Sequence, residues 1–210
     1  MLADHFPLLG LRLRTPRLEL RLPSSEELGE LADLAVEGIH DADVTPFPTA
    51  WALQSPGEVA LRVLQDHWQS LAAWSPRDWT LRLAVFLDGV VVGQQRISGR
   101  DFAITRQVET GSWLGKRYQG RGIGTEMRTA VLHLAFAGLD AEEAVSLTFA
   151  GVDASMAVSR KLGYEPNGVD RYVIDGKLTM DYRMRLTREA WRQAPVTIDG
   201  LDGCRTLLGL

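Results

Sequence analysis

The stretch from Trp113 to Thr125 (WLGKRYQGRGIGT) constrains the fold most, because it joins a strand-like run to a helix through a glycine-rich turn. Gly120, Gly122 and Gly124 carry no Cβ, so the backbone can approach a ligand closely at alternate positions. The amides of such a turn face one concavity at the positive end of the following helix dipole, which favours a phosphate group. The same region is basic and contains the cationic side chains Lys116, Arg117, Arg121 and Arg128.

The spacing of the glycines distinguishes between known phosphate-binding loops. A dinucleotide-binding fingerprint needs G-x-G-x-x-G after a first strand, whereas here the order is G-x-G-x-G in the middle of the chain. A Walker loop needs a lysine directly after its last glycine, whereas Thr125 follows Gly124. The segment 119–124 (QGRGIG) instead resembles the [QR]-x-x-G-x-[GA] pyrophosphate loop of the GNAT superfamily of N-acetyltransferases. A glycine-rich turn without a ligand is the alternative interpretation.

Composition narrows the class of protein further. The 210 residues are 45% hydrophobic and 24% charged, which suits a globular domain with a sizeable core. The net charge of −4 argues against nucleic acid or an anionic membrane as a partner of the whole chain. Cys204 is the only cysteine, which excludes an intramolecular disulfide, and the sequence has no apolar run of membrane-spanning length. We therefore expect a cytoplasmic protein.

Local patterns predict an alternation of strands and helices. Apolar alternation and apolar runs predict strands over 18–22, 79–87, 90–97, 108–114, 145–149, 170–174 and 178–185. Helical spacing predicts helices over 24–35, 56–74, 123–137 and 153–162. Two dipeptides, Asp88-Gly89 and Asp175-Gly176, are typical of hairpin turns. This order predicts an α/β (α+β) fold with a mixed, mostly antiparallel sheet of six or seven strands flanked by helices.

Single residues indicate where these helices begin and end. Ser24 or Ser25 is expected to cap the first helix, and Asp153 the last. Gly138 suits the position after the third helix, and Gly163 closes the fourth. We expect Trp68 on the apolar side of the second helix.

Separate pieces of the chain point to one branch of the GNAT superfamily. Residues 15–21 (TPRLELR) resemble the opening of the branch that acetylates ribosomal-protein N-termini, and residues 109–114 (ETGSWL) are similar to its strand before the loop. Residues 155–164 (SMAVSRKLGY) are similar to its late helix, and residues 185–191 (RLTREAW) to its closing strand. The pieces occur in the same order as in that branch. We therefore expect one GNAT domain over 11–192, followed by a tail over 193–210 that packs on the domain or across a dimer contact.

The resemblance implies how a cofactor would bind. The sheet would splay between the strands 108–114 and 145–149, and acetyl-CoA or another short acyl-CoA such as succinyl-CoA would lie in that gap. Its pantetheine amides would pair with the backbone of Trp113 and Leu114, while the Trp113 ring is expected in the core. The other residues assigned to the cofactor are Gln119, Gly120, Arg121, Gly122, Ile123, Gly124, Thr125 and Ser159.

Acyl transfer to an amine needs a base for the amine and a hydrogen-bond donor for the departing thiolate. Glu109 is the candidate base, because Glu109, Gly111 and Trp113 share one strand face; the alternative is an ion pair with a neighbour such as Arg106. By resemblance, Ser155 is the candidate donor to the sulfur, and local helix capping is the alternative. No metal is expected, because no two histidines have metal-ligand spacing among His5, His40, His67 and His133.

Two residues depart from the family pattern. Ser159 stands where many members have a tyrosine acid, and Val152 stands where the branch has an asparagine. The resemblance implies an N-acyltransferase, which is the leading interpretation, and these two departures are the support for a second one, a CoA-binding sensor or interaction module without catalysis. A nucleotide-binding protein is a third interpretation. The expected acceptor is a small-molecule amine or a protein N-terminus, near the proline-rich segment 46–48, and a homodimer is compatible with the sequence.

Overall fold

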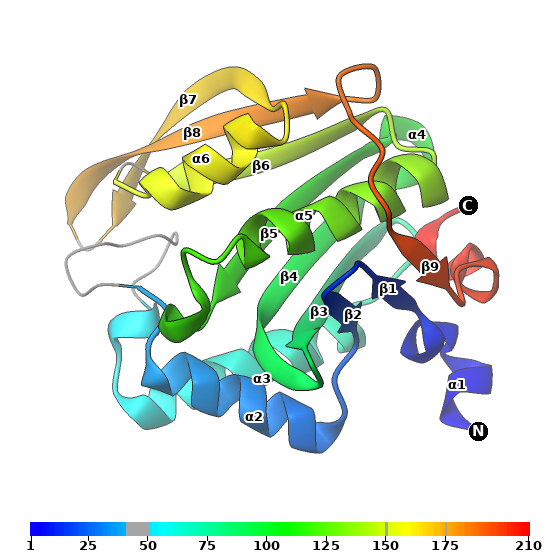
Figure 1. Cartoon of the computed structure of the whole chain (residues 1–210), viewed down its shortest axis with the longest axis horizontal. Coiled ribbons are helices and arrows are strands. Elements are labelled where there is room, and N and C mark those ends of the chain that lie inside the picture. The colour runs from blue at the N-terminus through cyan, green and yellow to red at the C-terminus, as the bar shows by residue number, and fades with distance from the viewer. Residues whose placement is uncertain (41–50, 150, 175) are drawn as a thin grey trace.

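The computed structural model describes residues 1–40, 51–149, 151–174 and 176–210 of the chain. Helices pack against both faces of a central nine-stranded sheet with the order β7-β8-β6-β5-β4-β3-β2-β1-β9 (Figure 1). The strands are β1 (Arg12–Arg14), β2 (Leu18–Arg21), β3 (Asp78–Leu87), β4 (Val90–Arg100), β5 (Gln107–Leu114), β6 (Glu143–Phe149), β7 (Glu165–Ile174), β8 (Lys177–Thr187) and β9 (Thr197–Asp199). The α-helices are α1 (Leu2–His5), α2 (Ser25–Glu37), α3 (Pro56–Ala72), α4 (Phe102–Thr105), α5 (Ile123–His133) and α6 (Asp153–Lys161).

Neighbouring strands run antiparallel except β5 and β6, which are parallel, so the predicted mixed and mostly antiparallel sheet is confirmed. Seven of the nine strands coincide with the predicted ones, and the two further strands are β1 and β9. They were missed because each is three residues long and too short to show an alternation. The described part of the chain also contains short helical turns, η1 (Pro7–Gly10), η2 (Trp51–Leu53), η3 (Lys116–Tyr118), η4 (Leu134–Gly138), η5 (Asp202–Cys204) and η6 (Thr206–Leu208).

Two apolar clusters form the core, one on each face of the sheet. On one face, α2 and α3 pack with Ala84, Phe86 and Val91, and the half-buried Trp51 and Trp113 lie against this cluster. On the other face, α5 and the chain termini pack with alternate residues of the same strands, such as Leu81 and Leu83. This arrangement places the glycine loop at one end of β5, between the two layers.

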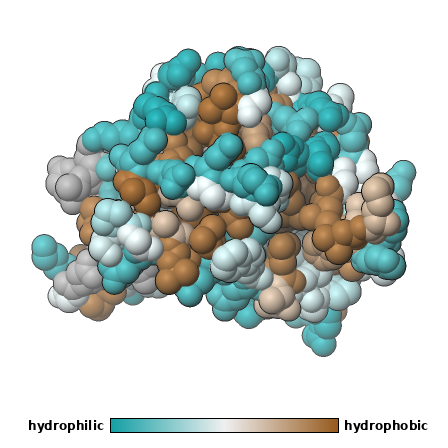
Figure 2. All heavy atoms as spheres, turned by 90° about the horizontal axis from the view of Figure 1, so that it is seen from below, coloured by the Kyte–Doolittle hydropathy of each residue, from teal (hydrophilic) through white to brown (hydrophobic). Residues whose placement is uncertain are grey.

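The surface of α3 corrects one prediction. Val59, Val63 and His67 are buried at a spacing of four residues, which rotates Trp68 out of the core to 54% exposure. Seen from below, the molecule shows apolar groups interspersed with polar ones (Figure 2). Single apolar side chains at a protein surface are ordinary, so Trp68 by itself marks no interface.

Backbone geometry confirms some of the residues predicted at helix ends and corrects two of these predictions. Ser24 caps α2 by accepting from the Glu27 amide, and Gly163 follows α6 with a φ of +89°. Asp153 does not cap α6, because Asp153 is the first residue inside the helix and Val152 occupies the cap position. Gly138 is not in the left-handed region; it lies in the π-helical turn η4, where a Cβ would come within 2.9 Å of Leu201. The glycine is therefore required by packing.

Of the two predicted hairpin turns, one can be compared with the structure in full. The first is confirmed, since Asp88 and Gly89 have φ values of +51° and +79° between β3 and β4. Asp175 of the second turn and the proline-rich segment 46–48 lie outside the described residues.

The C-terminal segment packs on the domain. β9 pairs with β1, and the side chains of Cys204 and Leu208 are fully buried. The Trp74 indole Nε1 donates to the Leu207 carbonyl at 2.8 Å. These contacts close the α5 face of the core at the end opposite the glycine loop (Figure 1).

The parallel pair β5 and β6 opens into a fork. Pairing joins 107–110 of β5 to 143–146 of β6 and then stops. Beyond this point β5 stays paired with β4 as far as Leu114, and β6 stays paired with β8 as far as Phe149. The edge of β5 from Gly111 to Leu114 that faces β6 therefore has no partner strand within the described residues. The predicted splay is confirmed, and we call the diverging segments 111–114 and 147–149 the fork.

Candidate active site

The glycine loop follows β5 and turns directly into α5. Gly120 and Gly122 adopt left-handed φ values of +71° and +78°, which disfavour any residue with a Cβ. Gly122 is the cap residue of α5 and offers no side chain to the first helical amides. None of the hydrogen bonds between described residues uses an amide between Gly120 and Thr125 as donor. These amides remain available for an anion at the positive end of the helix.

Gln119 differs from the expectation. Its amide donates to the Lys116 carbonyl at 3.2 Å, and its side-chain Nε2 donates to the carbonyls of Ile39 and Leu114 at 2.7 and 3.0 Å. All three bonds lie within the protein. Gln119 therefore orders the entry to the loop, and the phosphate contact predicted for it is not supported by its geometry.

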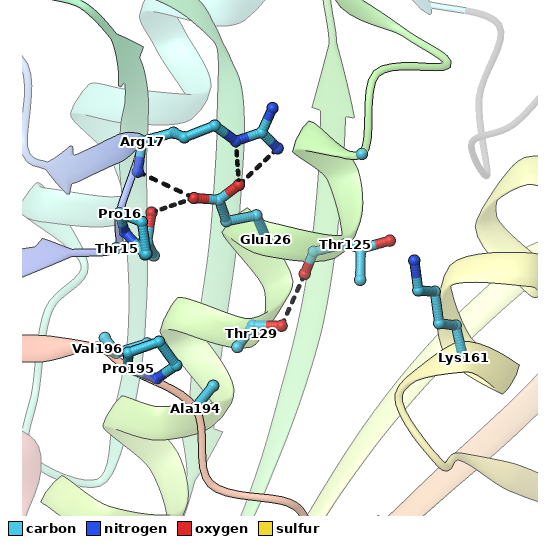
Figure 3. A pocket seen from close by; sticks show the side chains of 11 residues that line it. Thr15, Pro16, Arg17, Thr125, Glu126, Thr129, Lys161, Ala194, Pro195 and Val196 are labelled. Atoms are coloured by element: carbon cyan, nitrogen blue, oxygen red, sulfur yellow. Dashed lines mark hydrogen bonds and ion pairs between the residues drawn. The ribbon is translucent and has the colours of Figure 1, made fainter.

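A pocket with a volume of about 440 Å³ lies beside the first turns of α5. Figure 3 shows Arg17 on one side of it and Lys161 of α6 on the other, with Thr125 and Glu126 between them. The segment 194–196 closes its lower edge. The pocket includes Gly122, so it continues from the glycine loop and places two cations near it.

Glu126 of α5 binds two residues of the N-terminal segment 15–21 at this pocket. Its carboxylate accepts from the Thr15 hydroxyl at 2.6 Å and from Arg17 Nε at 2.7 Å. Burial raises the pKa of Glu126, but the hydrogen bonds from Thr15 and Arg17 together lower it below its ordinary value. The pairing holds Arg17 beside the loop, with Nη2 3.5 Å from the position of a Cβ on Gly122. In the sequence, Arg17 and Lys161 stand out only as parts of the segments 15–21 and 155–164, and nothing in the pattern indicates that they lie beside the loop.

Glu109 lies on β5, on the face that α2 and α3 cover. Its carboxylate forms an ion pair with Arg96 of β4, so the expected alternative of a pair with a neighbouring arginine is confirmed, with Arg96 in place of Arg106 as the partner. The Arg96 side chain crosses over Gly111, where a Cβ would come within 3.2 Å of Nε. Gly111 therefore gives the arginine room to reach Glu109. Glu109 keeps 34% of its side-chain surface exposed and can be reached from solvent.

Ser155 lies in the first turn of α6 and faces β6. Its hydroxyl is 3.1 Å from the hydroxyl of Thr148 in the fork. Helix capping is excluded for Ser155, because the cap residue is Val152 and no side chain caps this helix. Thr148 and Ser146 are alternate residues of β6 and share the face covered by α5 and α6. Ser155 and Glu109 thus lie on opposite faces of the sheet, with the fork between them.

Ser159 is fully buried one helical turn after Ser155. Its hydroxyl accepts from Arg128 Nη1 at 2.9 Å. Arg128 also donates to Ser146 and Ser112, so it joins α5, α6 and both strands of the fork. The sequence placed Arg128 among the cations of the loop, whereas the structure places it in the interior.

Trp113 and Leu114 end β5 beside the loop. The Trp113 ring packs against the cluster of α2 and α3, as predicted, and Leu114 is 8% exposed in the other cluster. Their backbone therefore provides the unpaired edge of the fork, while their side chains belong to the core.

The buried histidines are neutral parts of the core. Burial, together with the nearby Arg82, lowers the pKa of His67 to about 4. Burial also lowers the pKa of His133, which packs against Trp191 with ring centroids 5.8 Å apart. Within the described ranges, no three histidine, cysteine or acidic residues form a group suited to a metal. None of the helices in these ranges is long and apolar enough to cross a membrane.

The fork, the free amides of the loop and the paired polar groups on the two faces define the class of acyl-CoA-dependent transferases. The family model of the acetyltransferase (GNAT) domain matches residues 17–165. The protein belongs to the GNAT family and is an N-acetyltransferase.

Solved structures share this fold. RimL, a ribosomal-protein α-N-acetyltransferase solved with coenzyme A, is 18% identical with a TM-score of 0.62, over 84% of this chain and 97% of that chain. RimJ of Mycobacterium smegmatis, solved with CoA-disulfide, is 16% identical with a TM-score of 0.67, over 95% of both chains. A GNAT-family acetyltransferase from Bacillus anthracis is 15% identical with a TM-score of 0.66, over 85% of this chain and 99% of that chain. At these identities the likeness concerns the fold.

Proposed function

We propose that the protein transfers a short acyl group, acetyl or succinyl, from coenzyme A to a primary amine by direct attack in a ternary complex. The observation that carries this proposal is the row of amides from Gly120 to Thr125, which donate to no other described residue of the protein and lie beside the fork. Amides at a helix N-terminus suit a diphosphate. The unpaired edge of β5 suits the amides of a pantetheine arm, which would add to it as a strand.

The proposed binding residues divide by the part of coenzyme A that they would contact. The diphosphate would lie on the loop residues Gly120, Arg121, Gly122, Ile123, Gly124 and Thr125. The backbone of Trp113 and Leu114 would hold the pantetheine. Arg17 and Lys161 line the adjoining pocket and would attract a further phosphate there (Figure 3). Ser159 lies beneath the fork and would act on the cofactor only through Arg128.

The proposed chemistry uses both faces of the sheet. On the face of α2 and α3, Glu109 would take a proton from the attacking amine, directly or through a water, while Arg96 holds its carboxylate in place. On the other face, Ser155 would donate a hydrogen bond to the sulfur as the C–S bond breaks. The acyl-CoA supplies the thioester. Because a serine hydroxyl is a weak acid, solvent would finally protonate the thiolate.

The acceptor is a primary amine, either a protein N-terminus or a small molecule. The fold similarity to RimL and RimJ supports a protein N-terminus. A cytoplasmic location also belongs to this proposal and is supported by Cys204, which is buried and free.

Two measurements test the proposed function. Calorimetry should show binding of coenzyme A and none of ATP or NAD at the same concentration. Thiol release from acetyl-CoA and succinyl-CoA should then increase when peptides with free N-termini or small amines are added. Absence of coenzyme A binding would contradict the proposal. Binding without transfer to any amine would instead favour the non-catalytic sensor. Two residues support that alternative: Val152, in place of the asparagine of the branch, and Ser159, in place of the tyrosine of many members.

A further inference from the structure

Arg96 of β4 lies over the point where the fork opens. Pairing of β5 with β6 ends at Thr110, so Gly111 is the first residue of β5 whose edge towards β6 has no partner among the described residues. Arg96 is the register partner of Gly111 on β4. Its guanidinium covers the face of this glycine, since a Cβ on Gly111 would lie 3.2 Å from Nε and 3.3 Å from Nη2. A cation therefore stands at the closed end of the fork, on the face of α2 and α3.

The Arg96 side chain keeps donors for a ligand. Hydrogen bonds between described residues give this side chain one acceptor, the Glu109 carboxylate, which binds Nη2. An arginine has five N–H donors, and 30% of this side-chain surface is exposed to solvent. Arg82, the neighbouring arginine on β3, lies 3.6 Å from Asp66 and so has its own carboxylate. Arg96 can thus reach a ligand with Nε and Nη1 while Glu109 holds Nη2.

The strand register indicates which atoms of a bound thioester would meet this cation. The register of the parallel pair, continued by two residues, brings Ser112 level with Thr148. The hydroxyl of Thr148 contacts Ser155, the proposed donor to the sulfur, so the sulfur would also be level with Ser112. The carbonyl carbon is one bond nearer the closed end, and one residue of a strand spans about 3.3 Å. The carbonyl would therefore lie beside Gly111, where the guanidinium of Arg96 stands.

We propose that Arg96 is a catalytic residue of the acyl transfer, and that its guanidinium stabilises the oxyanion formed when an amine attacks the thioester. This inference rests on the proposed function, because it assumes the thioester beside Ser155. Attack from the face of Glu109 moves negative charge onto the carbonyl oxygen, and fixed donors aimed at such developing charge are a major source of catalysis. The ion pair adds to the effect. As Glu109 takes up the proton of the amine, it stops neutralising Arg96 at the moment when the oxygen gains its charge.

The step balances without a further reactant. The amine nitrogen bonds to the carbonyl carbon, and the electron pair of the C=O π bond moves to the oxygen beside Arg96. The proton of the nitrogen passes to Glu109 or to water. When the C=O double bond forms again, the C–S bond breaks and its electron pair stays on the sulfur beside Ser155. Arg96 keeps its charge throughout, because a guanidinium is not deprotonated in proteins.

Infrared spectroscopy of bound acetyl-CoA tests the contact before any transfer occurs. Labelling the thioester carbonyl with carbon-13 separates its stretching band from the bands of the protein. We expect the C=O stretch at a lower frequency in the wild-type complex than in the Arg96→Met complex, because a hydrogen bond from a cation polarises the carbonyl. An equal frequency in the two complexes would overturn the inference.

Initial rates and calorimetry then test the contribution to catalysis. Arg96→Met should lower kcat by about 10²-fold or more and leave the affinity for coenzyme A within about twofold, as for the loss of one oxyanion donor. Arg96→Lys keeps the charge and should retain more activity than Arg96→Met. Arg62→Met, which breaks an ion pair of 2.8 Å with Asp66 in α3, is the matched control and should change neither quantity.

A double variant separates this role from the positioning of the base. Arg96→Met should lower kcat by at least about tenfold again when it is introduced into Glu109→Gln, because the oxyanion forms whichever group takes the proton. No further loss in that background would show that Arg96 acts only through Glu109 and would overturn the inference.

The outcomes also separate this inference from the proposed function. A protein that transfers acetyl groups equally well with and without the Arg96 guanidinium would retain the proposed function and assign the oxyanion to other donors, such as backbone amides. Failure of the wild type to bind any form of coenzyme A would overturn both.

Discussion

At the scale of single residues, Glu109 is the position on which the proposed chemistry depends most. Glu109→Gln keeps the shape of the side chain and removes its capacity to accept a proton. We expect kcat to fall by about 10²-fold or more with little change in the affinity for coenzyme A, because the base acts only in the chemical step. Initial rates from pH 6 to 9 and calorimetry measure the two quantities. An unchanged kcat at every pH would remove Glu109 from the role. Glu143→Gln, which alters a similarly half-exposed carboxylate paired with Arg185 at the closed end of β6, is the matched control.

Ser155 allows a similarly specific prediction. Ser155→Ala removes the hydroxyl that contacts Thr148 and leaves the helix intact, since Ser155 caps nothing. We expect kcat to fall by about tenfold, as for loss of one hydrogen bond to a developing charge, with coenzyme A affinity within about twofold. A fall in affinity at full turnover would instead make Ser155 a binding residue. Rates and calorimetry on the same preparation decide between these results.

At the scale of elements, the turn from β5 into α5 determines whether a cofactor can bind. Gly122→Ala would place a Cβ on a residue with a φ of +78°, so the loop amides would have to shift. We expect the dissociation constant for coenzyme A to rise by about tenfold or more. Gly57→Ala in α3, where a Cβ meets no atom within 4 Å, is the control. Equal affinity of wild type and Gly122→Ala would show that the loop does not hold the diphosphate.

The elements also show what can be predicted from a sequence alone. Alternation over seven or more residues predicts β3 and β5 correctly, because burial of one face repeats along the strand. The three-residue β9 has no such repeat, and its pairing with β1 depends on a chain separation of more than 180 residues. The same limit applies to side chains. The pair of Glu109 and Arg96 follows from the register of β4 on β5, and the burial of Arg128 from hydroxyls on three separate elements.

At the scale of the whole molecule, buried His67 makes stability depend on pH. Its pKa of about 4 in the folded protein lies below the ordinary 6.5, so between these values the unfolded chain binds the extra proton. Stability is therefore lost as the pH falls from 6.5 towards 4. His67→Leu removes this titration. The difference in unfolding free energy between wild type and variant should shift by about 2 kcal/mol between pH 7 and pH 5, as measured by urea denaturation. A constant difference would contradict the buried neutral state.

The C-terminal segment links the first strand to the helix that follows the glycine loop. β9 pairs with β1, and Leu201 contacts Gly138 at the end of α5 and η4. Leu208 is fully buried in the same cluster as Ile123 and Met127 of α5. Leu208→Ala should therefore lower the free energy of unfolding by about 2–5 kcal/mol, whereas Leu178→Ala, at a site 56% exposed, should change it by less than about 1 kcal/mol. Urea denaturation of both variants provides the comparison. If instead the segment crossed to a second copy of the chain, the effect of Leu208→Ala would depend on protein concentration, and a stability independent of concentration supports packing within one chain.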